Sequence, residues 1–185
     1  MPVGAFDAEG AARELTAALR SLGTPGRAAQ EKRYLKSDLD FLGVTVPDIR
    51  RTVKAAVRRH PGQDREATVA WALALWREPV HEPRMAAVEV LTLGVRLLSA
   101  RDLGTVEQMI REARTWALVD ALACNVAGAI ALRDGSAWPR IDRWASDEDF
   151  WVRRSALLAL LPGIRSGRPD LARFTKYAEP LLAEK

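Results

Sequence analysis

Apolar residues recur at three- and four-residue spacing along nearly the whole chain, and breaks rich in glycine and proline separate the periodic stretches. This spacing indicates amphipathic helices, and the chain carries no alternating pattern of the kind that indicates a strand. The pattern therefore predicts an all-α protein. We expect its helices at residues 8–22, 27–37, 47–60, 64–77, 83–98, 102–114, 116–132, 138–145, 147–161 and 169–183.

The stretch at 116–132 is the most apolar of these, and Asp120 is its only charged residue. It is short for a membrane span and also carries Asn125 and Gly128, so we interpret it as a buried helix of a soluble, intracellular protein. Because an unpaired buried carboxylate is costly, Asp120 is expected to be paired or to face a cleft. Trp116 precedes it by one helical turn, which places the indole and the carboxylate on one face.

A repeat underlies the helices. Arg50, Arg84, Asp120 and Arg154 each lie early in an expected helix, and the steps between them are 34, 36 and 34 residues. Helix pairs that repeat at this period stack into a curved solenoid with a concave face. We therefore expect residues 1–185 to form a single HEAT-like-repeat domain.

In this register, the same point on successive inner helices carries Arg, Arg, Asp and Arg. Guanidinium groups suit phosphate oxygens, so a concave basic strip of this kind would follow a nucleic-acid backbone with strongly salt-dependent affinity. The alternative is that these arginines bridge neighbouring repeats by pairing with acids such as Asp147 or Glu82.

Composition changes this picture little. The chain of 185 residues suits one domain, and 48% hydrophobic with 28% charged residues is typical of a soluble globular protein. The net charge of +4 permits an anionic partner without requiring one. The single cysteine, Cys124, excludes an internal disulfide, and with two histidines it offers no spaced metal-ligand set, so we expect no metal. Without a secretory leader at its start, the protein is expected in the cytoplasm.

The residues equipped for chemistry are an acid, aromatic side chains and arginines, because phosphate-binding loops and nucleophile elbows are absent from the sequence. Trp116 with Asp120 forms the first candidate pair, Trp151 with Arg154 the second, and Tyr34 is a third candidate. Cleavage of the glycosidic bond of an alkylated base in DNA fits this set, since Asp120 would stabilise a cationic sugar and Trp116 would offer it a π face. The structural alternative is a packed tryptophan and an acid that caps or bridges a helix.

Five sequence blocks carry a resemblance to a known family. In order they are Arg33-Tyr-Leu-Lys-Ser, Phe41-Leu-Gly-Val-Thr-Val-Pro-Asp-Ile-Arg50, Leu75-Trp-Arg-Glu-Pro-Val-His-Glu-Pro-Arg-Met-Ala-Ala, Thr115-Trp-Ala-Leu-Val-Asp120 and Trp144-Ala-Ser-Asp-Glu-Asp-Phe-Trp-Val-Arg-Arg154. From about residue 30 onward, the chain resembles the DNA alkylation repair family of HEAT-like-repeat DNA glycosylases, the AlkD type.

The resemblance implies a right-handed superhelical solenoid of HEAT-like helix pairs with a concave basic face. It implies removal of N3- and N7-alkylated purines from double-stranded DNA without a cofactor, and we expect a monomer that binds no membrane. By motif, Trp116 and Asp120 correspond to the catalytic aromatic residue and carboxylate, Arg154 to the cleft arginine near the phosphate, and Tyr34 to the cleft tyrosine. Trp151 corresponds less closely.

The family also uses an aromatic residue from an inner helix further along the chain. Another step of about 35 residues from Arg154 ends just beyond Lys185, so we expect the domain to be incomplete at its C-terminus. Two alternatives to a glycosylase stay open: a non-catalytic HEAT-like module that holds DNA, and a protein-binding solenoid whose arginines pair internally.

Overall fold

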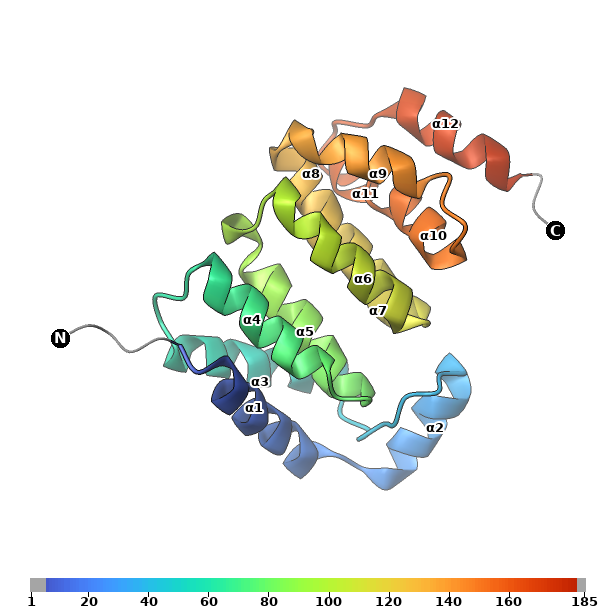
Figure 1. Ribbon diagram of the computed structural model, residues 1–185. Helices are drawn as coiled ribbons and strands as arrows, with labels where there is room; N and C mark the ends of the chain where they lie inside the picture. Colours follow the sequence, from blue (N-terminus) through green and yellow to red (C-terminus); the bar gives the residue numbers. More distant parts are fainter. Residues whose placement is uncertain (1–5, 183–185) are drawn as a thin grey trace. The chain divides into compact units, whose positions relative to one another are not determined.

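A computed structural model describes residues 6–182, whose regular structure is helical apart from an isolated bridge between Asp40 and Val80 (Figure 1). The all-α prediction is confirmed. The helices are α1 (Ala8–Leu22), α2 (Pro25–Leu35), α3 (Val46–Arg59), α4 (Arg65–Trp76), α5 (His81–Leu93), α6 (Leu103–Ala113), α7 (Trp116–Ala121), α8 (Ala129–Arg133), α9 (Trp138–Trp144), α10 (Phe150–Leu158), α11 (Leu161–Arg165) and α12 (Leu171–Leu181).

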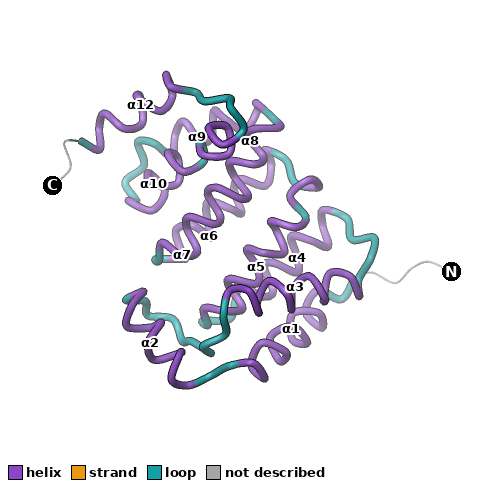
Figure 2. Tube along the Cα trace, turned by 180° about the vertical axis from the view of Figure 1, so that it is seen from behind, coloured by secondary structure: helices purple, strands orange, loops and turns teal. Residues whose placement is uncertain are grey.

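The chain divides into two compact units, residues 1–97 and 98–185, and we describe each by itself. Short loops join most of the helices within a unit (Figure 2). The expectation of one domain, the handedness of the superhelix and its concave basic face stay predictions.

Three helices are clearly shorter than the sequence pattern indicated, and the one expected at 169–183 spans Leu171–Leu181. Position 183 of that expectation lies outside the described residues. The helix expected at 83–98 ends at Leu93, and a short 3₁₀ turn at Val95–Leu97 follows Gly94. The helix expected at 147–161 begins only at Phe150, because Asp149 caps it and accepts hydrogen bonds from the first backbone N–H groups. Apolar residues continue beyond Leu93, so periodicity overestimated the length of α5, whereas the acidic residues 147–149 belong to the loop and cap before α10.

In the first unit, α4 packs along α5 and α1, and α3 packs on α1 and α5. Leu15, Leu19, Trp71 and Leu75 are fully buried in the core that these helices share. Each short helix buries one apolar face against its neighbours, which is how helices of this length gain most of their stability.

The buried carboxylate of Glu82 organises the loop that leads into α3. It is 0% exposed and accepts backbone hydrogen bonds from Leu42 at 2.9 Å, Gly43 at 2.6 Å and Val44 at 3.2 Å. Gly43 has φ +79°, and an added Cβ would lie 2.3 Å from the carbonyl oxygen of Thr24, so only glycine fits here. Glu82 thus fixes the Phe41–Arg50 sequence block to the start of α5.

In the second unit, a continuous helix runs from Trp116 to Arg133 through α7, a π-helical segment at Leu122–Gly128, and α8. By length and composition it is the one helix among the described residues that is apolar enough to cross a membrane, and 56% of that window is buried inside the structure. The segment packs against α6, α10 and α11, as expected for a core helix.

The π-helical segment lies where this helix approaches the end of α10 most closely. A Cβ added to Gly128 would lie 2.5 Å from the carbonyl oxygen of Ala159, so the two backbones touch without an intervening side chain. Such widened turns inside α-helices are frequent at functional sites. This one begins two residues after Asp120.

Ion pairs about one repeat apart connect the helices of the second unit. Glu107 on α6 accepts hydrogen bonds from Arg140 at 3.0 Å and from the indole of Trp144 at 2.8 Å, both on α9. Asp142 on α9 accepts from Arg173 at 2.8 Å and from the buried Tyr177 hydroxyl, both on α12. These links hold consecutive helix pairs in register.

The link between α9 and α12 depends on an ionised Asp142. The Arg173 guanidinium holds the pKa of Asp142 below its ordinary value, aided by the Tyr177 hydroxyl and opposed by burial. A carboxyl whose folded pKa is lowered contributes stability above its unfolded pKa of about 4, and that stability is lost as the pH falls through the folded value.

We predict that Asp142→Asn lowers the free energy of unfolding at pH 7 by about 1–3 kcal/mol, because it removes the charged acceptor of Tyr177 and one of the two carboxylates that bind Arg173, the other being Asp170. Urea denaturation of both proteins at pH 7 and pH 3 measures this, and the difference should shrink at pH 3. The matched control is Asp38→Asn, at an exposed position, which should change the free energy of unfolding little at either pH. A difference that stays constant with pH would contradict the assigned cause.

Candidate active site

Asp120 and Arg154 form a two-pronged ion pair between α7 and α10. The Nε of Arg154 donates to Oδ1 of Asp120 at 2.8 Å, and Nη2 donates to Oδ2 at 2.8 Å. Hydrogen bonds to Asp120 raise the pKa of Arg154, so the guanidinium stays charged. Of the two outcomes expected for Asp120, a partner or a cleft, the structure shows a partner, and it is the arginine 34 residues further along the chain.

The pair remains open to solvent. The Asp120 side chain is 31% exposed and that of Arg154 is 38% exposed. A carboxylate offers about four lone-pair positions, and Arg154 uses two of them. Asp120 is thus held in place by its partner while one side of the carboxylate is available to a ligand.

The orientation of Arg154 depends on how α10 begins. Asp149 caps this helix by accepting from the Trp151 N–H at 2.7 Å. Asp147, just before it, binds both nitrogens of the Arg111 fork, at 2.9 and 2.6 Å. These two acids fix the loop before α10 to α6, so that the Arg154 side chain emerges one turn into the helix.

A tryptophan precedes each member of the ion pair in the sequence. Trp116, one turn before Asp120 at the start of α7, is 43% exposed. Trp151, three residues before Arg154, is half-buried and meets Phe150 edge to face, with ring centroids 5.2 Å apart. Phe150 itself is 51% exposed. The sequence analysis did not select Phe150, although its position beside Trp151 and directly after the helix cap Asp149 indicated a second aromatic residue at the start of α10.

Cys124 follows Asp120 by one turn and closes the interior side of the pair. Its thiol donates to the Leu158 carbonyl at 3.5 Å, and burial raises its pKa, with the Asp120 charge adding to the effect. A neutral, buried thiol of this kind is a packing residue. Cys124 is therefore a core thiol.

The remaining predicted site residues lie in the first unit. Tyr34 on α2 is 72% exposed. Arg50 on α3 is 3.5 Å from Glu89, whereas Arg84 donates to the Glu78 carbonyl at 3.1 Å and lies 4.9 Å above the Trp76 ring. Their position relative to Asp120 stays a prediction.

The proposed repeat position therefore has different surroundings in each helix. Arg154 binds Asp120, while Arg50 and Arg84 bind groups of their own unit. The acids considered as alternative partners are engaged elsewhere, because Asp147 binds Arg111 and Glu82 binds the backbone of a loop. Contacts within the first unit thus occupy much of the hydrogen-bonding and stacking surface of the Arg84 side chain.

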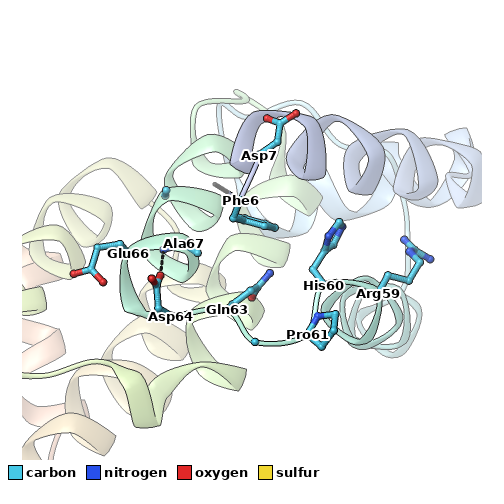
Figure 3. A pocket seen from close by; sticks show the side chains of 11 residues that line it. Phe6, Asp7, Arg59, His60, Pro61, Gln63, Asp64, Glu66 and Ala67 are labelled. Carbon is cyan, nitrogen blue, oxygen red and sulfur yellow. Dashed lines mark hydrogen bonds between the residues drawn. The ribbon is translucent and has the colours of Figure 1, made fainter. Parts of the chain in front are cut away.

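A pocket of about 860 Å³ lies in the first unit, and none of the predicted site residues lines it (Figure 3). His60 packs edge-on against Phe6 in its wall. Asp7 and Asp64 line it too, but both are helix caps that accept backbone hydrogen bonds. Between residues 6 and 182, His, Cys, Asp and Glu side chains form no group of three or more that could hold a metal ion.

A family model described as DNA alkylation repair enzyme matches residues 15–185. No curated protein matches the chain.

The exposure of the ion pair predicts that Asp120 contributes little to stability. Because exposed pairs contribute about 1 kcal/mol or less, Asp120→Asn should change the free energy of unfolding by no more than this. Glu82→Gln makes the same chemical change at a fully buried carboxylate with three backbone donors and should cost about 1–3 kcal/mol. Urea denaturation compares the two variants. Equal losses would identify Asp120 as a structural residue.

Proposed function

The chain belongs to the DNA alkylation repair enzyme family, and from this premise we propose that it is a DNA glycosylase. It hydrolyses the N-glycosidic bond of N3- or N7-alkylated purines in double-stranded DNA. The observation that carries the proposal is a solvent-accessible, ionised carboxylate, Asp120, held by Arg154 one turn after an exposed tryptophan.

The proposed reaction needs little from the protein beyond charge stabilisation. Alkylation makes the purine cationic, so the C1′–N bond breaks with its electron pair going to the base, which leaves as a neutral molecule. Positive charge then develops on the sugar, where the Asp120 carboxylate stabilises it. Water attacks C1′ and gives its proton to Asp120 or to solvent, which leaves an abasic site.

Trp116 and Arg154 are assigned supporting roles. The Trp116 ring offers a π face to the cationic base or sugar, an interaction that gains strength when water is excluded. Arg154 uses its Nε and one Nη2 proton to hold Asp120, and the rest of its planar fork is suited to a phosphate oxygen of the same nucleotide. One side chain would thus position both the carboxylate and the DNA.

A second candidate function is DNA binding without chemistry. It is favoured by the fact that both oxygens of Asp120 already accept from Arg154, which compensates the negative charge that the reaction would use. Salt-dependent binding of methylated duplex DNA without base release over long incubation would support this candidate against the glycosylase.

We expect the purified protein to release 7-methylguanine or 3-methyladenine from methylated duplex DNA. Asp120→Asn should lower the single-turnover rate on the order of 10²-fold, as expected for the loss of a charge aimed at the transition state. The released bases are quantified by chromatography. An unchanged rate for Asp120→Asn would remove this residue from the mechanism.

The role of Trp116 predicts a graded series. Trp116→Phe keeps a π face and should retain part of the rate, whereas Trp116→Leu should lower it by about 2- to 30-fold, the range of a cation–π contact. Phe174→Leu, at an exposed aromatic residue on α12, is the control and should leave the rate unchanged. If Trp116→Leu matches the wild-type rate, the tryptophan takes no part in the reaction.

A further inference from the structure

The two helices that carry the ion pair run in the same direction, in a register of 34 residues. Arg154 on α10 binds Asp120 on α7, which lies 34 residues before it. One turn further along both helices, the Cys124 thiol donates to the carbonyl of Leu158, again 34 residues away. Because the residue numbers rise together from one contact to the next, the two helices are parallel over this stretch.

The same register continues in both directions from these contacts. One turn beyond Cys124, a Cβ added to Gly128 would lie 3.0 Å from Cγ of Pro162, the residue at the corresponding step. One turn toward the start of both helices, the register places Trp116 opposite Phe150, which are the first residues of α7 and α10. Packed helices have axes about 8–10 Å apart, a distance that two aromatic side chains span together. Trp116 and Phe150 are therefore neighbours on adjacent helices, one turn from the ion pair.

Both aromatic rings are accessible to solvent. Trp116 is 43% exposed and Phe150 is 51% exposed. They are two of the three exposed aromatic side chains that the structure describes in the second unit, and the third is Phe174 on α12. Single exposed apolar residues are normal on a protein surface, whereas contiguous ones indicate a binding surface. The position of two exposed rings on adjacent helices therefore points to a ligand that contacts both.

The Phe150 ring is held in place by its own helix. Trp151 meets it edge to face, with ring centroids 5.2 Å apart and the ring planes at 69°. Asp149 fixes the first turn of α10 by accepting from the Trp151 N–H at 2.7 Å. Phe150 also precedes Arg154 by four residues, so its ring shares a helix face with the guanidinium that binds Asp120. An exposed ring that is already fixed loses little conformational freedom when a planar ligand binds.

We propose that Phe150 contacts the alkylated purine, so that Phe150 and Trp116 form two aromatic walls of the candidate active site. The proposal deepens the proposed function and rests on it for the identity of the ligand. A cationic base is attracted to the π face of an aromatic ring, whereas a neutral base gains only stacking. Phe150 therefore selects the alkylated base over the unmodified one before any bond breaks, and the Asp120 carboxylate acts afterwards on the sugar.

The test uses a duplex with a single 7-methylguanine whose sugar carries fluorine at the 2′ position. The fluorine withdraws electrons from C1′ and slows cleavage, so binding can be measured at equilibrium by fluorescence anisotropy. The measured quantity is the ratio of affinities for this duplex and for the same duplex with 2′-fluoroguanosine in its place. Phe150→Leu should lower this ratio by about 2- to 30-fold, the range of a cation–π contact. Phe150→Tyr keeps the π face and should retain the ratio.

The matched control is Phe174→Leu, the same chemical change at an exposed aromatic residue of α12, and it should keep the wild-type ratio. Urea denaturation should give Phe150→Leu the same midpoint as the wild type, because the ring is exposed. If Phe150→Leu weakens binding of both duplexes in equal proportion, the residue has a structural role and the proposal is wrong. An unchanged ratio in Phe150→Leu, or a ratio that falls equally in Phe150→Tyr, would also overturn it.

Base release by the wild type from methylated duplex DNA separates this proposal from the glycosylase assignment. If the wild type releases alkylated bases while Phe150→Leu keeps the affinity ratio, the glycosylase stands and the contact with Phe150 fails. If the wild type releases no base but prefers the 7-methylguanine duplex, and Phe150→Leu loses this preference, the contact stands and the glycosylase fails. A wild-type ratio near one would overturn the contact whether or not bases are released.

Discussion

Carboxylates that bind donors about one repeat away are the interaction on which both units depend. Glu82 reaches back to the loop at Gly43, and Asp120 reaches Arg154 on α10. Glu107 on α6 reaches forward to α9, and Asp142 on α9 reaches forward to α12. Burial of apolar faces drives these short helices together but does not define their register, because it has no direction. A carboxylate facing a guanidinium or a row of backbone N–H groups has one favourable geometry. The carboxylate of the Asp120 pair lies one helical turn from an exposed tryptophan, Trp116.

Much of this arrangement could be predicted from the sequence. The three- and four-residue periodicity located the helices, and the cost of burying an unpaired charge predicted that Asp120 would either have a partner or face a cleft. The sequence did not identify Arg154 as that partner, because the pairing depends on how α7 and α10 pack. Helix ends were less predictable, because apolar residues continue past Leu93, and the acidic residues 147–149 precede α10 as a loop and cap.

Contacts with nearby groups explain why the partners of some predicted site residues could not be read from the sequence. Arg84 occupies the proposed repeat position, but Trp76 and the Glu78 carbonyl lie within its reach and engage it. Neither contact is visible in a pattern of charges, because one partner is an aromatic ring and the other a backbone group. The π-helical segment after Asp120 also escaped prediction, since it depends on the close approach of Gly128 to Ala159. The sequence spacing thus predicted where these residues lie on their helices, whereas the surrounding side chains and backbone determine which partners they bind.

At the aligned position where three helices carry arginine, the fourth carries Asp120, which changes the charge available there to bind a nucleic acid. Asp120 neutralises Arg154, so this part of the second unit adds no net charge toward a phosphate backbone, whereas α3 carries an excess of +4. On the proposed function, the pair presents a fixed carboxylate to a substrate whose positive charge is already present before the bond breaks. A reaction of this kind requires no general acid, which is consistent with a residue set composed of one acid, one arginine and tryptophans.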